Sequence, residues 1–181
     1  MEPGNGGFAG QTGPMGNLIS PPEPLNRSHS LETFDCGIQP LNEWLRLYAL
    51  PNQKSGGART FVAHINSRVV GFFSLATGGI DPGMAPPRVS KGMARHPIPV
   101  IVLGRLAVDL EFQGTGLGRG LLKEAVLQTL YASKHAGIRA MLVHSKNENA
   151  RNFYLRFGFE PSPLNPNTLL YLLKDARRIF S

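Results

Sequence analysis

Hydrophobic positions recur along the chain at two spacings, which separate predicted helices from predicted strands. Leu41, Trp44, Leu45, Tyr48 and Ala49 recur at helical spacing and predict a helix that is ended by a proline two residues later. Further helices are expected from residue 117 to a glycine at 137, and over 147–157 before the next glycine. The predicted strands are residues 59–65, 69–80, 99–109, 138–144 and 168–173.

This order of elements indicates an α/β (α+β) fold with a mixed sheet. The 181 residues are enough for one domain with a sizeable core, and not comfortably enough for two. Residues 1–17 are rich in glycine and poor in large apolar side chains, so they are predicted to form a flexible tail. The domain is expected over 18–181, with regular structure beginning near His29. Residues 81–97 are expected to form one long basic loop.

Composition narrows the classes of function. Nineteen Lys and Arg face twelve Asp and Glu, which gives a net charge of +7. Such a chain either attracts a polyanion (nucleic acid, coenzyme A, a nucleotide or an acidic protein) or is simply a basic soluble protein. The single cysteine, Cys36, excludes internal disulfides and cysteine-based zinc sites. The five histidines lack metal-ligand spacing, and neither a membrane span nor a secretory signal is expected, so we predict a cytoplasmic protein without a metal.

A glycine-rich loop, residues 113–118, lies between a predicted strand and a predicted helix. Backbone amides and the helix dipole make this arrangement an anion-binding site. The dinucleotide fingerprint G-x-G-x-x-G fails, because Arg119 stands where one register needs its third glycine. Neither a P-loop nor a G-x-S-x-G nucleophile motif occurs. The pattern that does fit is Q-x-x-G-x-G, formed by Gln113, Gly116 and Gly118.

In this position, the pattern resembles the pyrophosphate loop of the GNAT N-acetyltransferases, which bind acetyl-CoA. A second element, one strand later, resembles the carboxyl-terminal helix and turn of the same family. Its residues are Asn147-x-x-Ala150-x-x-Phe153-Tyr154-x-x-x-Gly158-Phe159. The resemblance covers residues 58–173. It implies a single-domain GNAT fold, a mixed central sheet flanked by helices, and acetyl-CoA-dependent N-acetyl transfer.

A narrower resemblance, along most of the expected domain, is to the GNAT toxins of type II toxin–antitoxin systems. These toxins acetylate the α-amino group of aminoacyl-tRNA and stop translation. The resemblance implies aminoacyl-tRNA as substrate, a ribbon-helix-helix antitoxin as partner, and a homodimer. The segments that carry it are residues 34–37, 41–45, 52–53, 59–62, 71–75, 97–100 and 103–109.

The family resemblance also assigns roles to residues. Tyr154 matches the catalytic tyrosine; a phenol with a pKa near 10 is protonated at pH 7 and can donate to the leaving thiolate. The alternative is an aromatic residue of the core. Asn147 matches a pantetheine-binding position, and the alternative is a helix N-cap. The implied cofactor-binding set is Leu106, Ala107, Val108, Gln113, Gly114, Thr115, Gly116, Leu117, Gly118, Arg119, Asn147 and Phe153.

The acceptor amine is the last question. Residues 100–108 contain no Asp or Glu, whereas many GNAT enzymes carry a carboxylate there to deprotonate lysine. An α-amine, with a pKa of about 7.7–8.0, needs such a base less than lysine, at about 10.4. The candidate tRNA contacts are Arg88, Lys91, Arg95 and Arg105, each alternatively a solvated surface charge, and Arg105 alternatively a structural partner on its strand.

Two other functions remain open on the sequence. A GNAT enzyme acting on a small amine or a protein amine shares every cofactor argument and differs only in its acceptor. A non-catalytic basic nucleic-acid-binding module explains the charge and leaves the loop and the tyrosine without a purpose.

Overall fold

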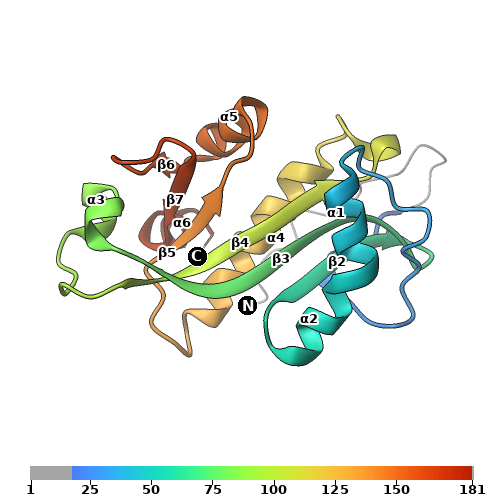
Figure 1. The fold of residues 1–181 in the computed structure, drawn as a ribbon, viewed down its shortest axis with the longest axis horizontal. Helices are drawn as coiled ribbons and strands as arrows, with labels where there is room; N and C mark the ends of the chain where they lie inside the picture. Colours follow the sequence, from blue (N-terminus) through green and yellow to red (C-terminus); the bar gives the residue numbers. More distant parts are fainter. Residues whose placement is uncertain (1–17, 181) are drawn as a thin grey trace. The chain divides into compact units, whose positions relative to one another are not determined.

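The computed structural model describes residues 18–180, so the predicted tail over 1–17 lies outside the described residues. Seven strands form a mixed sheet in the order β1-β2-β3-β4-β5-β7-β6 (Figure 1). The chain divides into two compact units. The first contains the chain up to Leu75 together with Arg105–Ala125, and the second contains Ala76–Gly104 and the chain from Val126 onward. The mixed sheet with flanking helices confirms the predicted fold class.

An antiparallel set of strands forms the framework of the first unit. β2 and β3 pair through a register that places Phe61 opposite Phe73, and β1 adds to the edge of β2. The turn between them has two residues at positive φ, Asn66 (47°) and Ser67 (72°), as a tight hairpin requires. The elements are β1 (Glu23–Pro24), α1 (Gln39–Glu43), the π-helical turn η1 (Trp44–Tyr48), α2 (Ala49–Ser55), β2 (Arg59–Ile65) and β3 (Arg68–Ile80).

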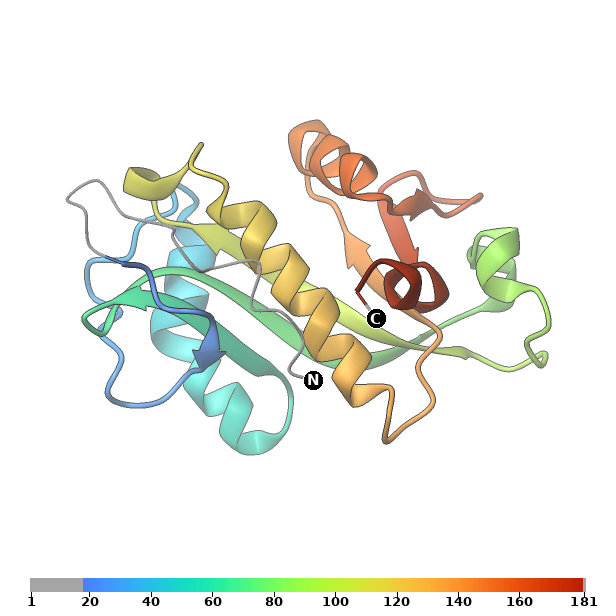
Figure 2. The same cartoon turned by 180° about the vertical axis from the view of Figure 1, so that it is seen from behind.

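Helices cover both faces of this hairpin (Figures 1 and 2). On one face, Phe72 of β3 packs in the buried cluster with Trp44, their rings stacked at 6.1 Å between centroids. On the other face, Gly71 lies under α4 (Leu117–Ala132), where a Cβ would approach Leu121 Cδ1 to 2.9 Å. Glycine at this position therefore lets the start of α4 pack directly on β3.

The helical spacing after Leu41 is confirmed, but the prediction that Pro51 ends the helix is wrong. The turn Trp44–Tyr48 is π-helical, and Tyr48 leaves ideal helical geometry with φ −116°. A new helix, α2, starts at the following residue. Pro51 therefore lies in a first turn, where its missing N–H removes no intrahelical hydrogen bond.

The second unit has a parallel pair of strands at its centre. β4 (Ile98–Val108) runs parallel to β5 (Ala140–His144), and β5 pairs antiparallel with β7 (Thr168–Leu172). Residues 140–143 of β5 are all buried, as expected for a strand covered on both faces. The other elements are the 3-10 turn η2 (Pro82–Met84), α3 (Pro87–Ser90), α5 (Glu148–Phe157), β6 (Glu160–Pro161) and α6 (Leu173–Phe180).

Several boundaries differ from prediction. Regular structure starts well before His29, because the Ser20 amide donates to the His64 carbonyl at 2.8 Å and β1 joins the sheet. The expected loop over 81–97 contains η2 and α3. α4 ends at Ala132 in tight turns, before the glycine at 137. Among the described residues, none of the helices has the length and hydrophobicity that a membrane span requires.

Candidate active site

The glycine-rich loop has the geometry of an anion cradle. It follows the 3-10 turn η3 (Leu110–Phe112) and leads into α4 at Leu117. Gly114 and Gly116 have φ of 76° and 89°, and a Cβ at either would meet no atom within 4 Å. Glycine is thus required by backbone conformation rather than by protein packing, and the space above the loop is open. The first amides of α4 lack intrahelical acceptors and lie at the positive end of the helix dipole.

Side chains hold this loop from the protein side. The Gln113 amide Nε2 donates to the carbonyls of Val108, at 2.9 Å, and Cys36, at 3.0 Å. The Thr115 hydroxyl donates to the Phe112 carbonyl at 2.5 Å. Gln113 therefore fixes the loop against the end of β4, while the glycine amides remain the groups that can meet an anion.

Asp109, which sequence reasoning left without a role, sets the turn from β4 into η3. It is only 3% exposed and accepts hydrogen bonds from the amides of Glu111, at 3.0 Å, and Asp35, at 3.1 Å. The sequence held a local indication of this role. An aspartate directly after an apolar strand can cap the helical turn that follows, by accepting a hydrogen bond from the backbone amide two residues later.

Within residues 18–180, the end of β4 before this turn has no strand partner on the edge that faces β5. The parallel pairing with β5 runs from Val100–Ala140 to Leu103–Val143 and includes no later residue of β4. Ala107 is buried in the first unit, while Leu106 and Val108 are half-buried. The side chains of this stretch pack, and its backbone is what it can offer to a ligand.

Arg105 is the predicted tRNA contact on the same strand. Its guanidinium lies 4.0 Å from the centroid of the Trp44 ring, a cation–π contact. Burial lowers the pKa of Arg105, which remains charged at neutral pH. The structure therefore gives Arg105 the structural partner that the sequence left open, and a phosphate contact stays a prediction.

Tyr154 is held on α5 in an aromatic pocket of the second unit. Its ring contacts Phe153 and Phe159 edge-on, with centroids 5.2 Å and 5.4 Å away. The residue is 7% exposed, and burial raises its pKa to about 12. Among residues 18–180, no hydrogen bond of the Tyr154 hydroxyl to another residue is found. A protonated phenol without a protein partner is free to donate a proton to a group that binds beside it.

Both ends of α5 are capped as the sequence predicts. The Asn147 side chain accepts a hydrogen bond from the Ala150 amide at 2.8 Å. Gly158 ends the helix at φ 112°. The N-cap alternative for Asn147 is therefore confirmed, and its pantetheine contact stays a prediction.

The three predicted phosphate contacts of residues 81–97 have different environments. Arg88 donates to Glu160 Oε1 at 2.6 Å and to Asp175 Oδ1 at 2.8 Å. These bonds raise the pKa of Arg88 and lower that of Asp175. Lys91 and Arg95 are exposed and form no ion pair within residues 18–180. Two of the three cations are thus open to a phosphate, and Arg88 is already paired.

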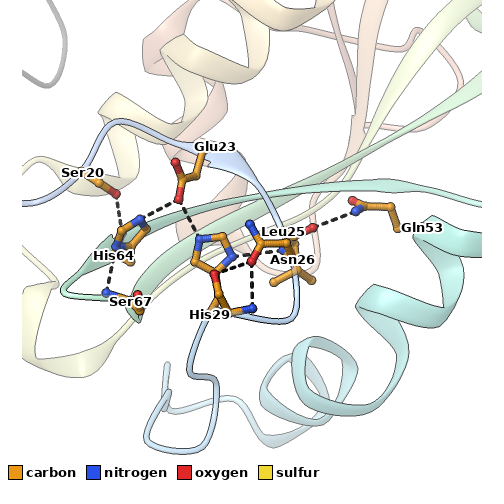
Figure 3. Close-up of polar contacts among 9 residues, drawn as sticks. Ser20, Glu23, Leu25, Asn26, His29, Gln53, His64 and Ser67 are labelled. Carbon is orange, nitrogen blue, oxygen red and sulfur yellow. Dashed lines mark hydrogen bonds and ion pairs between the residues drawn. The ribbon is translucent and has the colours of Figure 1, made fainter.

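One cluster in the described part of the chain has the composition of a metal site (Figure 3). His29 Nε2 and His64 Nε2 lie 2.8 Å and 2.7 Å from Glu23 Oε1. Their Nδ1 atoms accept backbone amides of Asn26 and Ser67, both at 3.1 Å. A ring whose Nδ1 accepts carries its proton on Nε2, which leaves no lone pair for a metal. The cluster is a hydrogen-bonded clasp that lowers the pKa of Glu23.

Comparison with known proteins identifies the family. The Acetyltransferase (GNAT) domain matches residues 56–161, more than half of the chain. A tRNA-acetylating toxin of Mycobacterium tuberculosis is 43% identical over 160 residues, which cover 88% of this chain and 96% of the toxin.

Solved structures agree with that match. AtaT complexed with acetyl-methionyl-tRNAfMet is 28% identical with a TM-score of 0.84, covering 90% of this chain and 99% of AtaT. A mutant AtaT toxin bound to the C-terminus of the antitoxin AtaR and to acetyl-CoA is also 28% identical, with a TM-score of 0.76 over 90% and 97% of the two chains. This chain therefore belongs to the GNAT acetyltransferases and is an N-acetyltransferase whose acetyl donor is acetyl-CoA.

Proposed function

We propose that this enzyme is a toxin that acetylates the α-amino group of aminoacyl-tRNA and thereby blocks translation. The observation that carries the proposal is that 43% of the aligned residues are identical to those of a tRNA-acetylating toxin, in an alignment that covers 88% of this chain and 96% of the toxin. We also expect an antitoxin that binds this chain, just as AtaR binds AtaT. This antitoxin is expected to belong to the ribbon-helix-helix class. We also expect a homodimer, acting in the cytoplasm where charged tRNA is found.

The main chain supplies the cofactor site in this proposal. The diphosphate of acetyl-CoA binds the amides of the loop from Gly114 to Arg119, and the Arg119 side chain adds positive charge in the first turn of α4. The pantetheine arm follows the β4 main chain at Leu106–Val108, beyond the last residue paired with β5. These contacts hold the thioester in place, so the acceptor amine meets an oriented electrophile.

The chemistry is a direct transfer. The neutral amine attacks the thioester carbonyl, a C–N bond forms, the C–S bond breaks, and the amine proton leaves to solvent. Tyr154 donates its hydroxyl proton to the departing thiolate and takes a proton back from solvent before the next turnover. Its pKa of about 12 keeps that proton in place throughout the physiological range. Positioned proton donors of this kind contribute about 10²–10⁴-fold in rate.

The missing carboxylate on β4 supports an α-amine as acceptor. No residue of Ile98–Val108 is acidic, so this strand offers no general base. At pH 7.5, about a third of an α-amine is neutral, against about one part in a thousand of a lysine side chain. The enzyme can therefore use the neutral fraction of an aminoacyl group directly, whereas lysine would need a base.

Two cations support tRNA as the carrier of that amine. Lys91 and Arg95 are exposed, and in the described chain no carboxylate pairs with them. Contacts of this kind set affinity through the phosphate backbone and make it dependent on salt. Arg88 is left out of the phosphate contacts, because Glu160 and Asp175 already neutralise it.

The test is mass spectrometry of a pool of charged tRNA after incubation with the protein and acetyl-CoA. Nuclease digestion releases aminoacyl-adenosines, and an acetyl mass shift identifies the acceptor amino acid. Tyr154→Phe should abolish most of the shift. Tyr131→Phe is the matched control, since Tyr131 is 63% exposed on α4.

The outcomes separate the proposal from its rivals. If acetyl-CoA binds and no aminoacyl species shifts, the acceptor is a small amine or a protein amine. Full activity of Tyr154→Phe would contradict the assignment of the proton donor.

A further inference from the structure

The short helix α3 carries the segment on which the proposed tRNA contacts lie. It has four residues, Pro87–Ser90, and Lys91 follows it directly. A single helical turn is not stable by itself, because helix nucleation is unfavourable. The last carbonyls of a helix also lack intrahelical donors. Other parts of the chain must therefore hold α3 in place.

Arg139 supplies the missing donors. Its Nε donates to the Val89 carbonyl at 2.9 Å, and its Nη2 donates to the carbonyls of Arg88, at 3.2 Å, and Lys91, at 3.1 Å. One planar guanidinium thus caps the carboxyl end of α3 and places a cation at the negative end of its dipole.

The main chain of Arg139 is itself fixed on both sides. Its amide donates to the Pro99 carbonyl at 2.8 Å, at the start of β4. Its carbonyl accepts from the Leu173 amide at 3.2 Å, at the start of α6. Arg139 therefore presents its side chain from a backbone position that is held just before β5, next to the buried Ala140.

A second tie holds α3 from the outside. The Arg88 side chain pairs with Glu160 of β6 and Asp175 of α6, and Figures 1 and 2 both show α3 beside β6. The exposed ion pairs are screened by water and contribute orientation more than stability. Together the two arginines fix α3 through its carbonyls and through one of its side chains.

We propose that Arg139 is a positioning residue for tRNA: by ordering α3, it presents Lys91 and Arg95 to phosphates in fixed places and contacts no phosphate itself. The inference rests on the proposed function for the identity of the ligand. The physical reason is entropic. Side chains that are already ordered before tRNA binds do not lose conformational freedom on binding, so binding costs less free energy.

The decisive variant pair is Arg139→Gln and Arg139→Lys. Lysine keeps the charge but is a point donor that cannot serve three carbonyls as the guanidinium does. Both variants should raise KM for aminoacyl-tRNA by about ten-fold, since two long side chains must then be ordered on binding. Neither should change the affinity for acetyl-CoA.

Arg156→Gln, which removes one exposed charge from α5, is the matched control and should have little effect. Full rescue by Arg139→Lys would overturn the proposal.

Salt dependence and a double-mutant cycle distinguish positioning from contact. The slope of log affinity against log salt should be unchanged in Arg139→Gln, because the phosphate contacts still form. A slope lower by about one would make Arg139 a phosphate contact and overturn the proposal. Adding Arg139→Gln to a Lys91→Gln/Arg95→Gln double variant should leave KM unchanged. An additive effect would also overturn it.

Hydrogen exchange tests the ordering without any substrate. The amides of Val89, Lys91 and Met93 are bonded within α3 and its following turn. They should exchange faster in both Arg139 variants and not in Arg156→Gln. Unchanged exchange would refute the inference even if tRNA is the substrate. Faster exchange in an enzyme that leaves tRNA unmodified would instead refute the proposed function and, with it, the tRNA part of the inference.

Discussion

The glycine loop and the basic segment, residues 81–97, are two proposed binding regions built in opposite ways. The loop acts through main-chain amides, which Gly114, Gly116 and the start of α4 orient within a few residues of one another. The basic segment acts through charged side chains. Its surroundings involve residues far away in the sequence: Glu160 and Asp175 pair with Arg88, and Arg139 bonds to the carbonyls of α3.

The difference shows which chemistry a sequence reveals directly. A backbone amide is a donor wherever the chain takes the required φ and ψ, so a local motif is sufficient to place it. A cation is a binding group only if no carboxylate has already paired with it, and pairing depends on the whole fold. Arg88 and Lys91 look alike in sequence, yet the first is paired twice and the second forms no ion pair within the described residues.

The largest expected effect tests the local nature of the loop. Gly116→Ala places a Cβ at φ 89° and also obstructs the approach of a phosphate. We expect the Kd for acetyl-CoA to rise by about 10–100-fold, from roughly 1–3 kcal/mol of backbone strain. Calorimetry should show no such change for Gly137→Ala, where φ is not positive and the space is open. Equal effects of the two variants would contradict the local account.

Tyr154 sharpens the comparison. Its position on α5 depends on residues close to it in the sequence, whereas its pKa depends on burial by the fold. Spectrophotometric titration should show one tyrosine ionising near pH 12 that is missing in Tyr154→Phe. The folded pKa lies above the unfolded value of about 10, so the stabilisation is complete below pH 10 and is lost as the pH rises through 12. Between pH 10 and pH 12, the free energy of unfolding of the wild type should fall by roughly 2–3 kcal/mol relative to that of Tyr154→Phe. A normal ionisation near pH 10 would show that the pocket is open to water.

Single charge removals in the basic segment should have smaller and unequal effects. Lys91→Gln and Arg95→Gln are each expected to weaken tRNA binding a few-fold and to lower the salt slope by about one. Arg88→Gln should leave the salt slope unchanged, since its charge is already paired. Binding measured at several salt concentrations separates the three. A reduced slope in Arg88→Gln would show that tRNA displaces the carboxylates.

The smallest effect is expected in the histidine clasp, another contact between distant residues. Hydrogen bonds from His29 and His64 lower the pKa of Glu23 in the folded protein. The ionised Glu23 therefore stabilises the fold above its unfolded-state pKa, near 4.5. This stabilisation is lost as the pH falls through the lower pKa of the folded state. The carboxylate is half exposed, so Glu23→Gln should cost only about 0.5–1 kcal/mol at neutral pH. Urea unfolding at pH 7 and pH 4 should show the difference shrinking in acid. A constant difference would exclude ionisation as its source.

Periodicity and local punctuation predicted most of the fold. β2 has its predicted bounds, and α5 ends before Gly158 as predicted but begins one residue after the predicted start at 147. The missed elements depend on tertiary contacts. β1 and β6 have two residues each and exist only through their pairing partners. α6 follows β7 without a break, so its apolar start at Leu173 was included in the predicted strand.

The candidate site divides along the same line. The loop and the caps of α5 could be found from sequence, since each depends on neighbours within a few residues. The role of Gln113 could not, because its acceptor at Cys36 is 77 residues away. Arg139 gave no signal at all, since its partners lie about 50 residues earlier.

The contact between Arg105 and Trp44 makes the protein its own optical probe. Trp44 is the single tryptophan, so all indole emission comes from one place. The cation above its ring is carried by β4, one residue before the stretch proposed to hold pantetheine. Acetyl-CoA binding along Leu106–Val108 should therefore change the intrinsic fluorescence, and cofactor occupancy can be followed in real time without a label.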